Sequence, residues 1–305
     1  MDTIDLDEKT SSRLSRLRDN LIKDGKVISG TTDTMFKIVM TSCKSYLTFL
    51  ISEFTNTNES VRNIIIQNNE LPLSNAKERK KISDFIAKVD KSLINFEMNS
   101  EYFDGLLIRN QAYLGKLEGE SLNASESFSN MQRFLQVNFN DFIHFKSDSP
   151  ILEFVYTDIV NGEIETENLK KYHISLPKLE KKYYNGDKLS KLEKALLILK
   201  LDKVKDLEEI SKGDKDLMEA VERIKDATFD INTIGLYDAE LDRKWKEEAK
   251  MAYAKKLGIK EGQEQGREEG QFSIISTMLK NGITPKKVIE MTGISLEKIK
   301  KMGLL

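Results

Sequence analysis

The feature that most constrains the fold is a pair of short alternating segments separated by three residues. Residues 82–89 and 93–99 carry apolar side chains at every second position near the connection between them. A period of two is typical of a β-strand with one buried face, and so short a connection joins antiparallel strands. The two segments predict a β-hairpin whose apolar side packs on a core.

Length and charge exclude several classes of protein. The chain has 305 residues, 48 Lys plus Arg, 50 Asp plus Glu, a formal charge of -2 and one cysteine. This length allows one large or two modest domains, and a single cysteine excludes a disulfide scaffold. Cys43 lies on an apolar helical stripe, so we interpret it as a buried hydrophobe. A near-neutral chain must bind nucleic acid, if at all, through local patches.

The ends and apolar runs indicate a cytoplasmic protein that does not enter a membrane. The acidic N-terminus lacks the basic head and apolar stretch of a secretory signal. The longest uninterrupted apolar run is residues 195–199, whereas a membrane span needs about 20 such residues.

The first half of the chain alternates between helical and strand periodicity. Residues 1–30 are expected to form a helical lead-in. A helix should begin at a cap provided by Thr31 or Thr32 and continue to Phe54, and a second helix is expected over residues 100–117. Besides the hairpin, strands are expected at residues 61–67, 134–142, 152–157 and 172–176, the last two joined through Asn161-Gly162. The predicted fold class is mixed α/β.

The second half is predicted to be helical. Helices are expected at residues 192–201 and 205–227, followed by a long polar helix in which a glycine recurs every four residues, at Gly258, Gly262, Gly266 and Gly270. Each glycine costs a helix about 1 kcal/mol relative to alanine. The glycines therefore mark either a close-packing seam or a weak linker, and the polar flanking residues favour the linker.

The tail, residues 272–305, carries a local positive charge. It contains six lysines and two glutamates, a net charge of +4, so residues 1–271 carry a net charge of -6. The spacing of Gly282, Pro285, Gly293 and Ser295 resembles a helix-turn-helix. The alternative is a small helical hairpin that packs on the body or on another subunit, with its lysines merely solvated.

The hairpin carries the one constellation with a chemical argument. If its loop is Asp90 and Lys91, Asp84 lies opposite Glu97, and Asn95 and Asn99 share that face. Two carboxylates about 5 Å apart repel by about 3 kcal/mol at an effective dielectric of 20. A hard divalent cation such as Mg²⁺ relieves this repulsion. The alternative is a solvated polar strand surface that pairs with lysines of residues 77–81.

The order of motifs along the chain resembles the PD-(D/E)xK nuclease family transposases, also called recombination-promoting nucleases. The resemblance extends from about Thr32 to the end and implies a restriction-endonuclease-like core, a central mixed sheet flanked by helices that cuts DNA with Mg²⁺. It is carried by Thr32-Asp-Thr-Met-Phe-Lys37, Asn69-Glu70, Asp84, Ile94-Asn-Phe-Glu-Met-Asn99, Arg109-Asn-Gln-Ala-Tyr113, Gln136-Val-Asn-Phe-Asn140, and the glycine repeat before the tail.

This resemblance assigns roles to the hairpin residues. Asp84 and Glu97 become metal ligands, and Asn99 takes the position of the motif lysine. Many relatives have glutamine there, and asparagine is one methylene shorter. Lys37 can supply the missing positive charge if its helix packs beside the sheet; the alternative is a surface lysine.

Other residues have two readings. Arg109 can contact DNA phosphate or stack on Tyr113. Asp33 and Glu70 assist at the metal, or they cap a helix and end a strand. The single histidines, His144 and His173, are interpreted as structural.

Together these observations predict a Mg²⁺-dependent or Mn²⁺-dependent DNA endonuclease of mobile-element type. The expected divisions are a lead-in at 1–30, a nuclease core at 31–189, a helical region at 190–257, a linker at 258–271 and a tail at 272–305. Lys280, Lys286 and Lys287 are expected to contact the DNA backbone, and the C-terminal helices to support homo-oligomers. The alternatives are a catalytically degenerate relative that acts as a DNA-binding or oligomeric scaffold, and a helical interaction protein without a nucleic-acid role.

Overall fold

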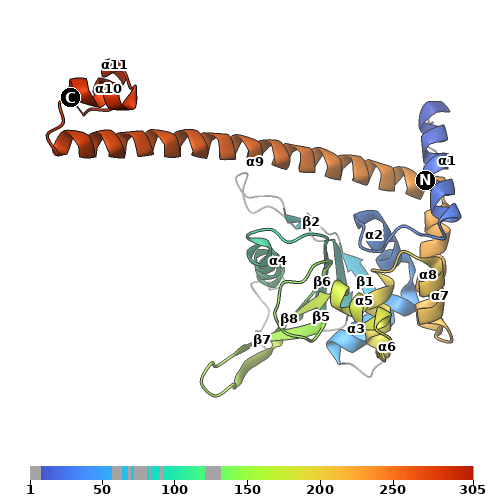
Figure 1. The fold of residues 1–305 in the computed structure, drawn as a ribbon. Helices are drawn as coiled ribbons and strands as arrows, with labels where there is room; N and C mark the ends of the chain where they lie inside the picture. Colours follow the sequence, from blue (N-terminus) through green and yellow to red (C-terminus); the bar gives the residue numbers. More distant parts are fainter. Residues whose placement is uncertain are drawn as a thin grey trace. The chain divides into compact units, whose positions relative to one another are not determined.

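A computed structural model describes residues 8–56, 64–67, 70–71, 81–82, 84–89, 92–120 and 132–304. The chain divides into two compact units, residues 1–240 and 241–305. The first unit is built on a six-stranded sheet (Figure 1). In spatial order its strands are β1 (Ile64–Gln67), β4 (Phe85–Val89), β5 (Ser92–Asn99), β6 (Arg133–Asn140), β8 (Ile164–Ser175) and β7 (Ile151–Thr157). A separate antiparallel pair joins β2 (Glu70–Leu71) and β3 (Lys81–Ile82).

The predicted hairpin is confirmed, in the predicted register. β4 and β5 are antiparallel, with Val89 opposite Ser92 and Phe85 opposite Phe96. Phe85, Phe96 and their alternating neighbours lie in the main core. Because side chains alternate between faces, the register directs Asn95, Glu97 and Asn99 to the other side of the sheet.

The centre of the sheet is parallel. β6 pairs in parallel with β5 on one side and with β8 on the other, whereas β7 returns antiparallel to β8. The predicted strand pair around Asn161-Gly162 is therefore confirmed, and Gly162 takes the positive φ of 73° that its turn requires. Helix α4 (Leu106–Glu120) lies between β5 and β6 in the sequence and packs on one face of the sheet.

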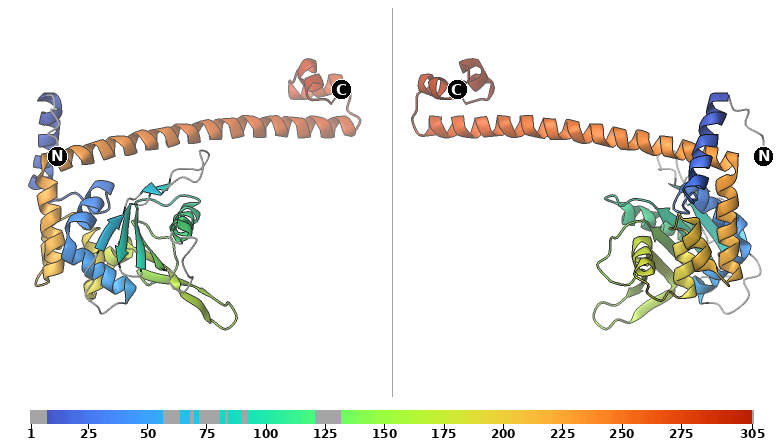
Figure 2. Two further views of the ribbon diagram at one scale, coloured as in Figure 1. Left: turned by 180° about the vertical axis from the view of Figure 1, so that it is seen from behind. Right: turned by 45° about the vertical axis from the view of Figure 1, so that its right-hand side comes forward.

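Helices cover the apolar face of the sheet, opposite α4 (Figure 2). The rings of Phe36 and Phe139 pack edge to face, with their centroids 5.5 Å apart. The Tyr46 hydroxyl donates a hydrogen bond to the Ala195 carbonyl at 2.8 Å. The helices that contribute to this core are α2 (Asp33–Ser42), α3 (Lys44–Thr55), α5 (Leu176–Tyr184), α6 (Lys191–Ile198), α7 (Val204–Ser211) and α8 (Lys215–Phe229). The first unit thus continues past residue 189, where the sequence suggested a boundary, because α6 to α8 bury their apolar faces in the same core.

Two helices expected to be continuous are broken. The helix expected from Thr32 to Phe54 is interrupted at Cys43, whose φ of -96° and ψ of 86° are not helical. Glu219 of α8 accepts hydrogen bonds from the backbone N–H groups of Ser45 and Tyr46 at 2.8 and 3.1 Å, so it caps a new helix start. The helix expected at 205–227 divides into α7 and α8 around Gly213, which has a φ of 81°.

Helix α1 (Glu8–Lys23) and the start of α9 (Ile231–Lys280) complete the first unit. Arg13 of α1 pairs with Asp238 of α9 at 2.8 Å. Glu240 accepts hydrogen bonds from the backbone N–H groups of Asp33 and Thr34 at 3.1 and 3.2 Å, and it thereby fixes the N-terminus of α2.

The second unit contains the remainder of α9, α10 (Pro285–Thr292) and α11 (Leu296–Lys301) around a small core of Ile275, Val288 and Ile299. As expected, Pro285 begins α10, and Ser295 caps α11. The glycine repeat lies within α9. In the described part of the chain, no helix is long and apolar enough to cross a bilayer.

Candidate active site

The α4-facing side of the sheet carries a buried array of polar side chains where the three parallel strands end. We call this array the polar grid. Each strand first contributes an apolar residue to this face and then three polar residues, so that the strands align in three rows. The rows are Asn95, Gln136 and Lys171; Glu97, Asn138 and His173; and Asn99, Asn140 and Ser175. Ligand and active sites of α/β sheets commonly lie at the carboxyl ends of parallel strands.

Helix α4 covers the grid with both apolar and polar residues. Leu114 and Leu117 pack on Leu93 and Phe134, the apolar residues that precede the grid. One turn or more toward the N-terminus of α4, Asn110 and Arg109 contact the grid itself. The apolar contact fixes the helix, and the helix then positions these two polar side chains.

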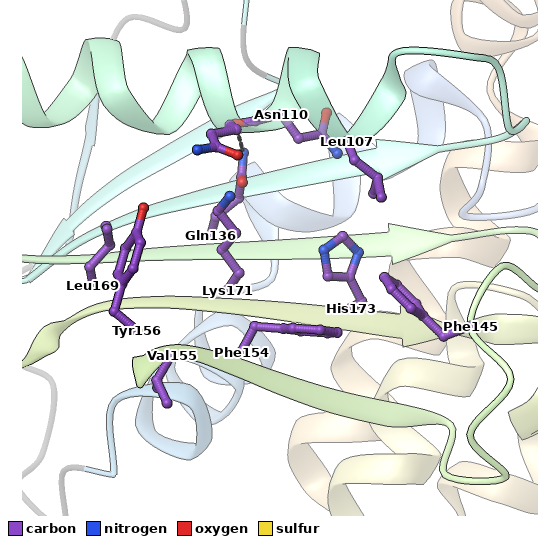
Figure 3. Close-up of a pocket in the computed structure, with 11 residues that line it drawn as sticks. Leu107, Asn110, Gln136, Phe145, Phe154, Val155, Tyr156, Leu169, Lys171 and His173 are labelled. Carbon is purple, nitrogen blue, oxygen red and sulfur yellow. Dashed lines mark hydrogen bonds between the residues drawn. The ribbon is translucent and has the colours of Figure 1, made fainter. Parts of the chain in front are cut away.

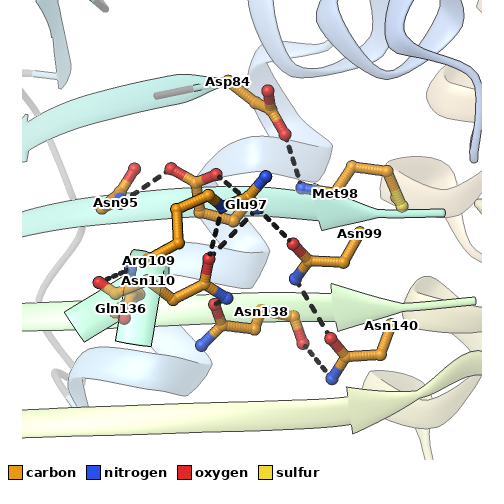
Figure 4. A network of polar contacts seen from close by, with 10 residues as sticks. All are labelled: Asp84, Asn95, Glu97, Met98, Asn99, Arg109, Asn110, Gln136, Asn138 and Asn140. Atoms are coloured by element: carbon orange, nitrogen blue, oxygen red, sulfur yellow. Dashed lines mark hydrogen bonds and ion pairs between the residues drawn. The ribbon is translucent and has the colours of Figure 1, made fainter. Parts of the chain in front are cut away.

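Hydrogen bonds fix the middle of the grid (Figure 4). Asn110 donates to Asn138 Oδ1 at 2.8 Å, and Asn138 donates in turn to the Tyr172 carbonyl at 3.0 Å. Gln136 donates to the Asn110 carbonyl at 2.8 Å. Burying amides costs little when both their donors and acceptors are paired, and paired amides hold one orientation.

Glu97 is buried within this network, with 2% of its surface exposed. Asn95 donates to Glu97 Oε1 at 3.0 Å, and Arg109 Nη2 lies 3.9 Å from Glu97 Oε2. A buried carboxylate needs such partners because burial removes its hydration.

Arg109 links Glu97 to Asn99. Its guanidinium donates to Asn99 Oδ1 at 2.7 Å and to Asn110 Oδ1 at 3.1 Å. It also lies over the rings of Phe103 and Tyr113, at 5.4 and 5.5 Å from their centroids. The stacking on Tyr113 that the sequence allowed is therefore present, and it holds the guanidinium beside the carboxylate. Arg109 remains about a third exposed, at 35% of its side chain.

Asp84 lies at a bend immediately before β4 and is tied to β5. Its Oδ2 accepts a hydrogen bond from the Met98 backbone N–H at 2.7 Å. Burial raises the pKa of Asp84 to about 6, and this effect outweighs the Met98 hydrogen bond that lowers it. The field of Asp33 raises this pKa further, whereas Lys37 and Arg109 lower it. A cation next to Asp84 would favour its charged form.

Lys37 and Asp33 come from the first turns of α2. Lys37 pairs with Asp33 at 2.8 Å. Helix α2 packs on the sheet, and the charge of Lys37 lowers the pKa of Asp84. Asp33 acts electrostatically on Asp84 in addition to lying in the first turn of its helix.

The other candidate residues lie elsewhere. Lys280, Lys286 and Lys287 are exposed in the second unit. Asn69 and the side chain of Glu70 fall outside the described residues. His144 stacks on Tyr102, with ring centroids 4.5 Å apart.

Sequence reasoning missed several members of the grid. His173 appeared to be a lone histidine, but it lies in the middle row, where its Nδ1 is 3.5 Å from Asn140 Nδ2. Gln136 and Asn138 lie in a segment that carries the family resemblance, but the sequence alone gives neither them nor Lys171 a place in the site. The available signal was the same pattern on three strands, an apolar residue followed by polar residues at alternate positions; its use required knowing that the strands pair in parallel.

The residue types near this end of the hairpin are oxygen donors, the kind that a hard divalent cation takes. Asp84 and Glu97 carry carboxylates, and among the described residues Asn95 Oδ1 is a buried acceptor without a hydrogen-bond partner. The described residues contain no group of three or more His, Cys, Asp or Glu side chains arranged for a metal. Mg²⁺ suits such a site, because it often binds one or two carboxylates and completes its shell with water and substrate phosphate.

Comparison with known proteins gives one finding. A family model described as PD-(D/E)XK nuclease family transposase matches residues 31–254. No match was found among curated proteins or among solved structures. The mixed sheet with flanking helices and a helical C-terminal region agrees with the restriction-endonuclease-like fold expected of that family.

Proposed function

The chain belongs to the PD-(D/E)XK nuclease family transposases, and from this premise we propose that it is a metal-dependent DNA endonuclease. The family supports a function of nuclease or transposase type. The finer statement, hydrolysis of DNA phosphodiester bonds with Mg²⁺, is our proposal, and Mn²⁺ is the expected substitute.

One observation carries the proposal. Asp84 and Glu97 approach the same end of the β4–β5 hairpin, and Arg109 is held next to Glu97 by aromatic rings and amides. This combination is more demanding than two acids on a polar strand, because a fixed cation of α4 lies beside Glu97 and the carboxylate of Asp84 is tied to the same strand.

Each residue then has a role. Asp84 and Glu97 would hold the divalent ion, which when bound polarises a phosphoryl oxygen and activates water. Asn95 keeps the Glu97 carboxylate oriented through its hydrogen bond. Asn99 is short and neutral, and it accepts a hydrogen bond from Arg109. It therefore serves to position the guanidinium.

We assign to Arg109 the positive charge that the motif lysine would have supplied. Its charge lies 3.9 Å from Glu97, and a third of the side chain is open to a phosphate. Guanidinium groups bind phosphate through paired N–H donors, so Arg109 can stabilise negative charge that develops on the scissile group. Lys37 offers a second charge on the Asp84 side.

Plasmid nicking tests the proposal. Wild type should nick supercoiled DNA in Mg²⁺ and leave it intact in EDTA. Glu97→Gln should lose more than the roughly 10–100-fold that loss of an outer-shell partner costs a metal site. Glu101→Gln removes an exposed acid four residues away and is the matched control. Equal nicking by wild type and Glu97→Gln would remove Glu97 from the reaction.

A charge-swap experiment tests the role of Arg109. Arg109→Met should lower the nicking rate by about 10²–10³-fold, the range found when one preorganised electrostatic donor is lost. Adding Asn99→Lys to that variant should raise the nicking rate again by at least about tenfold, because a positive charge then occupies the position of the motif lysine. A rate unchanged by Arg109→Met would contradict the assignment.

The catalytically degenerate relative remains the rival. The deep burial of Glu97 and the amide at position 99 are the observations that favour it. It predicts DNA binding without metal-dependent nicking, and no gain from Asn99→Lys in either background.

A further inference from the structure

A cavity of about 320 Å³ lies beside the candidate site, within the first unit (Figure 3). It opens along the first row of the polar grid, between α4 and strands β6, β8 and β7. Its walls include Gln136, Lys171, His173, Phe145, Phe154 and Tyr156. Small-molecule pockets span roughly 300–1,000 Å³, so this cavity suits one small ligand or one nucleoside.

The wall of the cavity contains an unpaired acceptor. Gln136 is fully buried, and its Nε2 is committed to the Asn110 carbonyl. Because a carbonyl accepts, this bond fixes which end of the amide carries the oxygen. Among the described residues, Gln136 Oε1 has no hydrogen-bond partner. A buried acceptor left unpaired is costly, and this oxygen is itself covered, so it adds polarity to the wall without lying open to a ligand.

A lysine is the neighbour of Gln136 on the adjacent strand. Lys171 is paired in register with Gln136 on the neighbouring strand and shares its face. Within the described ranges, no carboxylate pairs with Lys171, and burial lowers its pKa. The adjacent Lys170 provides a contrast, since it bonds Glu153 and Glu167 on the other face.

Aromatic rings form the opposite wall. Phe145 and Phe154 lie edge-on to His173, at 5.0 and 5.4 Å between ring centroids. Phe154 and Tyr156 are 40% and 47% exposed on β7. Exposed rings beside a cationic groove are the surfaces on which nucleic-acid bases stack.

We propose that this cavity binds a nucleobase, extruded from the DNA strand whose phosphate occupies the neighbouring Glu97 site. The proposal rests on the proposed function for its source of bases. A base has a flat face for the rings and acceptor atoms on its edge for the amine of Lys171, which lines the same cavity. Asn110 lines the cavity and also accepts a hydrogen bond from Arg109. The base in the cavity and the phosphate at Arg109 would therefore bind next to each other.

The test compares Lys171→Met with the matched control Lys170→Met. In EDTA, which leaves the strand uncut, we would measure affinity for a duplex with one T·T mismatch and for the fully paired duplex. A mismatched base costs less to extrude. Wild type and Lys170→Met should prefer the mismatch by about tenfold (about 1.4 kcal/mol), and Lys171→Met should bind the two duplexes equally.

A second arm identifies the source of the base. Deoxynucleoside monophosphates are titrated calorimetrically into the same three proteins. Binding that Lys171→Met loses, without any mismatch preference, would assign the cavity to free nucleotides and overturn extrusion. If neither arm separates Lys171→Met from Lys170→Met, the cavity binds no base.

Plasmid nicking is scored separately. A chain that nicks DNA but fails both arms retains the proposed function and loses the pocket. A chain that passes either arm without nicking retains a base site and loses the nuclease.

Discussion

At the scale of single residues, the positive charges that act on Glu97 and Asp84 come from helices rather than from the strands of the hairpin. Arg109 belongs to α4, and Lys37 belongs to α2. A lysine at position 99 would bring its charge with the strand. With asparagine there, the charge depends on the packing of α4, because Phe103, Tyr113 and Asn110 hold the guanidinium. Mutations that weaken the packing of α4 on the sheet should therefore displace Arg109 from Glu97, even when they lie outside the candidate site.

The buried histidine of the grid makes stability depend on pH. Burial, with smaller effects from the charges of Lys171 and His144, lowers the pKa of His173 from 6.5 to about 4. The unfolded chain thus binds the proton more readily than the folded chain between these values, so this contribution is intact above pH 6.5 and is lost as pH falls toward 4. The difference between the folded and unfolded pKa values of His173 corresponds to a loss of up to about 3 kcal/mol in the free energy of unfolding.

His173→Gln should remove that dependence. Urea unfolding at several pH values between 4 and 7.5 would measure the free energy of unfolding for both proteins. The raised pKa of Asp84 acts in the opposite direction, since stability falls as pH rises from 3.8 to about 6. The informative quantity is therefore the difference between the free energies of unfolding of the variant and of wild type at each pH. This difference should change across the range for His173→Gln, and a difference that stays constant with pH would refute the assignment.

At the scale of elements, local patterns predicted what depends on local physics. The register between β4 and β5 is the one that a two-residue loop dictates. The alternation of apolar residues supports it, because a one-residue slip would turn the apolar side chains of one strand outward. The turn at Gly162 and the cap at Ser295 were equally local. Each of these features is decided by a few neighbouring residues.

Features that depend on distant partners could not be read in this way. The break at Cys43 follows from Glu219, which is 174 residues from Ser45. The polar grid requires parallel pairing of β5, β6 and β8, and the position of Arg109 requires α4 to cross their face. Asp84 and Glu97 belong to one hairpin, so the sequence alone can relate their positions, whereas Asn138 and His173 meet only in the assembled sheet.

The cap supplied by Glu219 gives a testable consequence. Glu219→Ala should lower the free energy of unfolding by about 1 kcal/mol, since two backbone N–H groups at the start of α3 lose their acceptor. Glu219→Gln should cost less, because its oxygen still accepts while the favourable charge at the helix N-terminus is gone. Denaturant unfolding measures both. Glu53→Ala, at an exposed position of α3, is the control, and an equal loss in Glu53→Ala would mean that the cap contributes nothing.

At the scale of the whole molecule, the glycine repeat and the tail belong to the second unit. Gly258, Gly262, Gly266 and Gly270 lie in continuous helix, and a Cβ added at any of them would meet open space among the described residues. Within the second unit they therefore do not form a packing seam. Measuring mass in solution separates a linker from the predicted homo-oligomer, since only a seam between two copies would double the mass.

The division into an acidic body and a basic tail predicts how DNA binding responds to salt. Exposed lysines that contact phosphates release counterions, so each contact steepens the fall of log affinity with log salt by about 0.9. Removing Lys286 and Lys287 together by substitution with alanine should flatten that slope by about 1.8 and weaken binding to all sequences alike. Replacing the exposed Lys212 and Lys215 of the first unit removes the same charge without touching the tail, and should leave the slope nearly unchanged. Fluorescence anisotropy of a labelled duplex between 50 and 200 mM salt measures all three proteins. If the two double variants change the slope equally, the tail lysines are only solvated and DNA contacts lie elsewhere.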